Sequence, residues 1–271
     1  MGPLTPGEIL ETISNSSVGK AGGRAGKLFL LAILAGVYIA LGAQGSNIAA
    51  CNFFADPATY GLGRLIAACV FPIGLTMVVL CGAELFTGNC LMLTGVLDKK
   101  IRISGLLRNW VIVYIGNLVG SVLIVMIMYY SGLFENGADM LGAVTVKIAA
   151  TKTGLSFGKA FLLGIACNWL VCLAVWMATG APSVPGKIMA IFLCIGLFVV
   201  CGFEHSVANM YFIPAGILAS ANETFVQLSG ADISNLTWGG LAGNLIPVTL
   251  GNIVGGSVMV GAAYWLALKK L

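Results

Sequence analysis

Long stretches without a charged residue constrain the fold of this 271-residue sequence more than any other feature. They cover residues 28–55, 65–83, 109–134, 160–186, 188–203, 205–222 and 233–268. A helix needs about 20 apolar residues to cross a bilayer, so most of these stretches are long enough to span one. Only 9% of the residues are charged, whereas a soluble domain carries about 25%. The chain is therefore predicted to be embedded in a lipid bilayer.

The fifth and sixth stretches are too close together for two separate spans and are interpreted as one interrupted span. The sequence thus predicts an all-α integral membrane protein with six transmembrane helices, in a single membrane domain over residues 1–271. If both termini are cytoplasmic, ten of the 14 Lys and Arg residues lie inside. The other four are Arg64, Lys147, Lys152 and Lys159. Excess positive charge faces the cytoplasm, which favours this orientation.

The chain contains an internal repeat, with one half at residues 20–130 and the other at 147–268. The segment Cys81–Glu84, followed by Asn89, recurs as Cys201–Glu204, followed by Asn209. Asparagine and glycine positions in the third span likewise recur in the sixth span. Each half holds three spans, so the second half is inverted relative to the first. An inverted 3+3 repeat predicts a pathway near the midplane, where the halves meet.

Both halves interrupt an apolar span with the sequence Cys-Gly-x-Glu. Irregular backbone and a carboxylate at membrane depth are tolerated only beside protein or a cavity. The sequence therefore predicts broken helices two and five, with breaks at residues 82–89 and 202–209. Glu84 and Glu204 are expected to brace these breaks by accepting hydrogen bonds from freed backbone N–H groups, because both halves keep them. A direct role in transport is the alternative for both.

His205 is the one histidine of the chain, and it breaks the symmetry of the repeat, because Leu85 takes its place in the first half. Thr87 breaks the symmetry as well, since it faces Val207. An imidazole changes charge near neutral pH. We therefore favour a functional His205 at the break over a neutral core histidine satisfied by one carbonyl.

Apolar residues at helical spacing and two lysines complete the set of candidates. The apolar positions are Phe71, Leu75 and Val78 in span two, and Ile195 and Phe198 in span five. Packing and a constriction of the pathway fit their spacing equally well. Lys152 and its counterpart Lys20 are either solvated charges or parts of electropositive vestibules that concentrate anions.

Other classes of function find little support. The eight cysteines form no CxxC pair, and one histidine with unclustered acids provides neither a metal site nor a nucleophile constellation. No enzyme activity, metal or cofactor is therefore expected. There is no basic stripe for nucleic acid. A water or ammonia channel fits less well than an anion pathway, because the sequence has no Asn-Pro-Ala pair and lysines flank the pathway.

Several motifs in order resemble those of the formate/nitrite transporter family. They are Val79–Gly88, Gly164–Ala174, Gly202–Met210 and Asn244–Asn252, and the similarity covers roughly residues 5 to 268. The resemblance implies an aquaporin-like protomer with one pore, assembled as a homopentamer. The site residues that it implies are Thr87 and His205 meeting in the pore, Lys152 in the vestibule, Asn168 and Asn252 in the pore region, and Phe71, Leu75 and Phe198 at constrictions.

The implied function is a channel for small monovalent anions of weak acids, in the cytoplasmic membrane of a prokaryote. Overall similarity favours the hydrosulfide branch of the family, with formate next and nitrite also possible. The alternative is a proton-coupled secondary transporter of formate or nitrite on the same scaffold. In the predicted mechanism, His205 gives its proton to the anion, so that a neutral acid crosses the second constriction. Small anions and membrane lipid are the expected partners.

Overall fold

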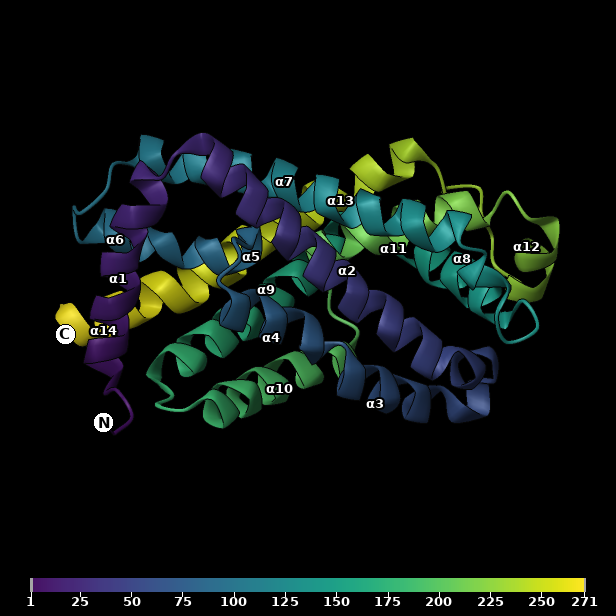
Figure 1. Cartoon of the computed structure of the whole chain (residues 1–271), viewed down its shortest axis with the longest axis horizontal. Coiled ribbons are helices and arrows are strands. Elements are labelled where there is room, and N and C mark those ends of the chain that lie inside the picture. The colour runs from purple at the N-terminus through teal and green to yellow at the C-terminus, as the bar shows by residue number, and fades with distance from the viewer. Residues whose placement is uncertain (1, 271) are drawn as a thin grey trace.

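The structure is a computed structural model that describes residues 2–270, so the first and last residues of the predicted domain lie outside the described residues. Helices and short helical turns make up the fold (Figure 1). The α-helices are α1 Pro6–Gly22, α2 Ala25–Ala55, α3 Tyr60–Val70, α4 Pro72–Cys81, α5 Phe86–Asn89, α6 Leu93–Leu97, α7 Ile103–Tyr130, α8 Met140–Thr153, α9 Phe157–Gly180, α10 Val184–Cys201, α11 Ser206–Ala219, α12 Glu223–Ser229, α13 Trp238–Ile253 and α14 Ala263–Lys269. Three-residue turns lie at η1 Pro57–Thr59, η2 Cys90–Met92 and η3 Leu133–Glu135, and a π-helical segment at η4 Val254–Ala262.

Six helical segments among residues 2–270 are long and apolar enough to cross a membrane, in agreement with the predicted number. They are Ala25–Ala55, Pro57–Cys81, Ile103–Tyr130, Phe157–Gly180, Val184–Cys201 and Trp238–Lys269. The predicted second stretch began at residue 65, because the charge of Arg64 interrupts the apolar run. The helix includes Arg64 because its guanidinium donates to the backbone carbonyls of Val199 and Val200, at the end of α10.

Helices two and five are broken at matching positions. α4 ends at Cys81 and α10 at Cys201, and the next residue is a glycine with a left-handed backbone, φ 75° at Gly82 and 74° at Gly202. Glycine adopts this conformation without the steric penalty of a Cβ atom. The chain becomes helical again at α5 and α11, so the breaks are shorter than predicted. The asparagines expected at their ends lie inside the new helices.

Glycines allow close helix contacts in both halves. α7 packs against α2, where a Cβ atom added to Gly120 would lie 2.0 Å from the carbonyl oxygen of Ile33. At the matching contact, a Cβ atom added to Gly255 would lie 2.2 Å from the carbonyl oxygen of Ile165 in α9. Both belong to the glycine positions that recur in the third and sixth spans, and small residues let helix backbones approach closely in lipid. The halves differ beyond this point, since span six continues as η4 and span three stays α-helical.

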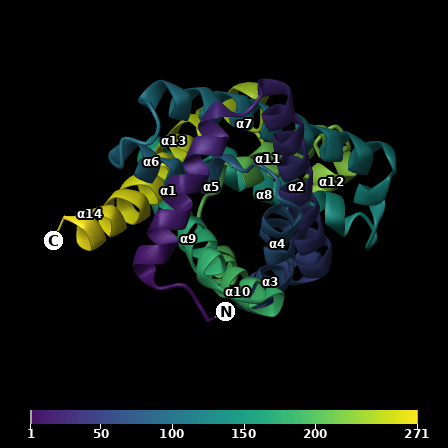
Figure 2. The ribbon, with the colours of Figure 1, turned by 60° about the vertical axis from the view of Figure 1, so that its left-hand side comes forward.

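Shorter helices close the two ends of the molecule. α1 begins with a capping box of Thr5 and Glu8, buries Leu10 and Ile13, and crosses the same end as α14 (Figure 2). α8 and α12 lie at the opposite end (Figure 1). α8 is not among the helices expected from the sequence. We call the end with α1 and α14 the terminal end and the end with α8 and α12 the distal end.

Candidate functional site

Asn252 holds the break of helix five in place. Its Oδ1 accepts a hydrogen bond from the backbone N–H of Ser206 at 2.9 Å. Its Nδ2 donates to the carbonyl oxygens of Gly164 at 2.8 Å and Glu204 at 3.0 Å. Asn252 is fully buried. One side chain of span six therefore joins both sides of the break to span four.

Asn117 makes the same three bonds in the first half. Its Oδ1 accepts from the N–H of Phe86 at 2.9 Å, and its Nδ2 donates to the carbonyl oxygens of Ala32 at 2.8 Å and Glu84 at 2.9 Å. The two asparagines thus provide the backbone brace that was expected of the glutamates. The repeat contains the signal for this brace, because both halves keep the asparagine.

The carboxylates of Glu84 and Glu204 bind side chains, which corrects the expectation that they accept backbone N–H bonds. Lys20 Nζ donates to both oxygens of Glu84 at 2.8 Å, and Lys152 Nζ donates to Oε1 of Glu204 at 2.7 Å. The asparagine five residues further on also donates to each carboxylate, at 2.7 Å and 2.6 Å. Each candidate vestibule lysine is therefore paired with the glutamate of its own half.

Thr87 and His205 meet between the two breaks. Oγ1 of Thr87, in the first turn of α5, lies 2.9 Å from Nε2 of His205, the N-cap residue of α11. Both side chains are buried. The other ring nitrogen, Nδ1, accepts a hydrogen bond from the backbone N–H of Ala208 at 3.0 Å.

These contacts fix the direction of the hydrogen bonds. Because Nδ1 accepts, a neutral His205 carries its proton on Nε2, and this N–H donates to Thr87 Oγ1. The hydroxyl hydrogen of Thr87 then points away from the ring. Within residues 2–270 it finds no acceptor. The pair thus leaves one hydroxyl donor available to a third group.

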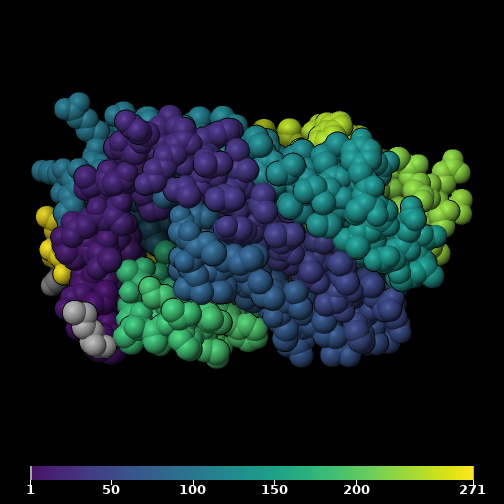
Figure 3. Space-filling model, viewed as in Figure 1, coloured from purple at the N-terminus to yellow at the C-terminus, as the bar shows by residue number. Residues whose placement is uncertain are grey.

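Two cavities approach the breaks from opposite ends. The terminal cavity has a volume of about 310 Å³ and lies beside α1, where Figure 3 shows a hollow between α1 in purple and α4 in blue. Its lining includes Lys20, Leu75, Val78, Glu84 and Leu85. The distal cavity has a volume of about 540 Å³, and its lining includes Phe71, Lys152, Phe198, Glu204 and His205. No described residue lines both cavities.

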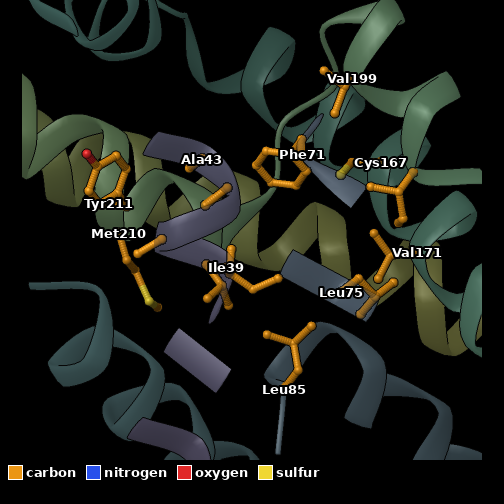
Figure 4. Close-up of a cluster of buried hydrophobic side chains, with 14 of the residues drawn as sticks. Ile39, Ala43, Phe71, Leu75, Leu85, Cys167, Val171, Val199, Met210 and Tyr211 are labelled. Atoms are coloured by element: carbon orange, nitrogen blue, oxygen red, sulfur yellow. The ribbon is translucent and has the colours of Figure 1, made fainter. Parts of the chain in front are cut away.

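Buried apolar side chains separate the cavities. On the distal side, the rings of Phe71 and Phe198 meet edge to face, with centroids 5.4 Å apart, and Phe198 stacks on His205 at 6.0 Å. On the terminal side, Leu75 and Leu85, both labelled in Figure 4, are buried and line the terminal cavity. Leu85 is not among the candidates expected from the sequence. Its only signal was its place opposite His205 in the repeat.

Asn168 and Asn252 line neither cavity. Asn168 Nδ2 donates to the carbonyl oxygen of Thr87 at 3.1 Å and to that of Asn252 at 2.6 Å. Cys172 Sγ contacts the same Thr87 oxygen at 3.3 Å. The two asparagines therefore hold the backbone around the Thr87–His205 pair and do not line either cavity themselves.

Comparison with known proteins decides the family. The model of the family described as formate/nitrite transporter matches residues 7–266. The chain belongs to this family. It is 41% identical to the probable formate transporter of Methanothermobacter thermautotrophicus over 260 residues, which cover 90% of each chain. It is 36% identical to the formate channel FocA of Escherichia coli K12, over 97% of this chain and 94% of that one.

A solved structure supports the same assignment. The pentameric formate channel with formate bound matches with a TM-score of 0.80 at 41% identity, over 91% of this chain and 98% of that chain. These relatives of the formate/nitrite transporter family are named for formate, so they give no support to the predicted preference for hydrosulfide. Membership of a family of transporters and channels agrees with the expectation that the chain is not an enzyme. Within residues 2–270, no group of three His, Cys, Asp or Glu side chains is placed to hold a metal ion.

Proposed function

We propose that the chain is a channel for small monovalent anions of weak acids, with formate as its main substrate. The names of the relatives support formate, and nitrite and hydrosulfide become the alternative substrates. The pentameric relative supports a homopentamer with one pathway in each protomer. Both termini are placed in the cytoplasm by the positive-inside rule. The terminal cavity then opens to the cytoplasm and the distal cavity to the other side.

The observation that carries this proposal is the Thr87–His205 pair at the barrier between the cavities. An anion that enters the barrier loses water, at a cost of several kcal/mol. A hydrogen bond to a charged group contributes about 1.5–3 kcal/mol. The free hydroxyl donor of Thr87 can offset part of the desolvation where the apolar side chains offer nothing. Phe71, Leu75 and Phe198 then exclude larger and more strongly hydrated ions.

The contacts of His205 favour hydrogen-bond donation over the proton transfer predicted from the sequence. A second proton on the ring would have to bind Nδ1, and the bond from the N–H of Ala208 would be lost. That bond caps the start of α11. A neutral ring adds polarity to the barrier without a fixed charge that would trap the anion. This role suits a channel better than a proton-coupled transporter.

Flux into proteoliposomes tests the proposal. We expect formate to move fastest and chloride slowest, with nitrite and hydrosulfide between them, when the four are compared at several pH values. Flux should follow the anion gradient at fixed pH. One proton moved with each anion, with saturation at low turnover, would instead establish the secondary transporter. If none of the four anions moved faster than through empty liposomes, the proposed function would be wrong.

The His205→Asn variant links the flux to the pair. Asparagine is a good N-cap residue, so α11 keeps its cap. Its shorter side chain does not reach Thr87 as the imidazole does. We expect a lower formate flux and altered selectivity against chloride, with unchanged assembly on size-exclusion chromatography. Unchanged flux and selectivity would remove His205 from the mechanism.

A further inference from the structure

We infer that the distal cavity holds a second anion site, built by Asn47, Arg64 and Lys147, which loads the pathway from the distal end. The site is separate from the Thr87–His205 pair, and its ligand class is the small monovalent anion. Its role in transport rests on the proposed function, but its ability to bind an anion does not. The three residues come from three helices, α2, α3 and α8, and all line this cavity.

The two cavities differ in charge, although the repeat pairs a lysine with a glutamate in each. The charged residues lining the terminal cavity are Lys20 and Glu84, which bind each other, so their formal charge is zero. The distal cavity contains the equivalent pair and also two more cations, Arg64 and Lys147. Its lining therefore has a formal charge of +2. A cavity with low-dielectric walls and one sign of charge concentrates counter-ions.

The positive charge of Arg64 is not neutralised by a carboxylate in the described part of the chain. Its guanidinium donates to the carbonyls of Val199 and Val200, and it forms no salt bridge with any described residue. Those carbonyls end α10, and the C-terminal end of a helix carries partial negative charge. Arg64 covers this end, which would otherwise repel an anion at the mouth of the pathway. Lys20, the cation among the described residues lining the terminal cavity, binds Glu84 and Asn89 and does not cover the end of α4.

Lys147 is the second uncompensated cation. Its Nζ donates to the carbonyl oxygen of Phe54 at 3.4 Å, and no carboxylate among residues 2–270 lies within salt-bridge distance. It shares one face of α8 with Val144, Ile148 and Thr151, at helical spacing, and this face lines the cavity. The ammonium group is therefore held at the wall by a neutral oxygen only.

Asn47 adds a directed donor to this charge. The side chain is buried, with 2% exposed, and its Nδ2 has no hydrogen-bond partner among the described residues. A buried amide nitrogen in a native protein almost always has a partner, either protein or water. Asn47 precedes Phe54 by two helical turns on α2, so both face the same cavity. An anion held near Lys147 would give this amide its missing acceptor.

Bromide provides a direct test of binding, because its anomalous scattering locates it in crystals. We expect a bromide peak in the distal cavity beside Asn47 and Lys147, and none in the terminal cavity. The peak should disappear in Lys147→Gln and Asn47→Leu and persist in Lys159→Gln. Lys159 is the matched control, an exposed lysine in the first turn of α9 that does not line the cavity. A distal cavity without bromide in the wild type would overturn the inference.

Formate currents of single channels in planar bilayers test the role in loading. We expect the concentration for half-maximal current to differ between the two chambers, being lower at the distal face. Removing one positive charge from the distal cavity should raise the half-maximal concentration at the distal face about fivefold. Lys147→Gln should bring the two values close together, and Arg64→Gln should do the same where the variant assembles. Lys159→Gln should keep the difference.

The outcomes separate the two proposals. A wild type without formate current would refute formate as the main substrate, while bromide in the distal cavity would still establish the site. Currents with the same half-saturation at both faces, or a difference that survives Lys147→Gln, would refute the loading role. If Asn47→Leu keeps both the bromide peak and the asymmetry, diffuse charge attracts the anions and the built site is wrong.

Discussion

Replacing Asn252 with leucine tests the idea that one buried amide holds the break beside His205. The change is nearly isosteric and removes three hydrogen bonds. The carbonyl of Gly164 lies inside α9 and keeps an intrahelical donor. The N–H of Ser206 and the carbonyl of Glu204 lie at the break, and they lose the hydrogen-bond partner that the Asn252 side chain provides. A buried group left without a partner costs about 1–3 kcal/mol, so two predict a loss of about 2–6 kcal/mol in the free energy of unfolding.

The measurement is an unfolding titration in detergent micelles, and the matched control is Asn117→Leu. Asn117 makes the equivalent bonds at nearly equal distances, 2.9, 2.8 and 2.9 Å. The two variants should therefore lose similar stability, within about 1–2 kcal/mol of each other. A loss below about 1 kcal/mol for Asn252→Leu would refute the brace. A large loss for Asn252→Leu beside a stable Asn117→Leu would refute the equivalence of the two halves.

Three further predictions follow from single contacts. Thr87→Val should lower formate flux by a factor of about 10 to 150, because the hydrogen bond to the anion, worth about 1.5–3 kcal/mol, is lost. Thr87→Ser should keep most of the flux, and a Thr87→Val channel as fast as the wild type would contradict the donor role. Lys152→Gln should cost about 3–5 kcal/mol in unfolding free energy because it leaves Glu204 buried and unpaired, and adding Glu204→Gln should restore most of it. Burial opposes the ionisation of Asp98, but hydrogen bonds from Lys269, Ser14 and Trp265 outweigh it and lower the pKa to about 2. The ionised Asp98 therefore stabilises the fold fully above pH 4, and this contribution is lost as the pH falls towards 2. Acid titrations should show a loss of about 2 kcal/mol in the free energy of unfolding that is absent in Asp98→Asn.

Most of the fold could be predicted because the bilayer allows few solutions. Apolar length predicted six spans, and glycines beside a carboxylate predicted the two breaks. The start of span two was predicted too late, because a charged residue such as Arg64 ends an apolar stretch in a hydropathy argument. The structure satisfies this charge with carbonyls that are 135 and 136 residues away in sequence. α8 was missed for a similar reason, because Lys147 and Lys152 make it look like a loop between spans.

The site could be predicted only in part. His205 stood out because it breaks the repeat, and the structure places its ring against Thr87. Asn117 and Asn252 show the opposite pattern: they occur at matching positions in both halves, and they brace the scaffold. The partners of the glutamates had no local signal, because Lys20 lies 64 residues before Glu84 and Lys152 lies 52 before Glu204. Such pairs become visible only when distant helices are brought together.

The repeat therefore divides the molecule into what is equal in both halves and what differs. The asparagine braces and the lysine–glutamate pairs are equal, so they stabilise both breaks without favouring one direction. Leu85 opposite His205, and the extra cations at the distal end, make the two approaches unequal. Unequal approaches change the rate at a given concentration, but a passive channel carries no net flux at zero electrochemical gradient. A steady formate gradient built up without any other gradient would contradict a channel, however asymmetric its cavities are.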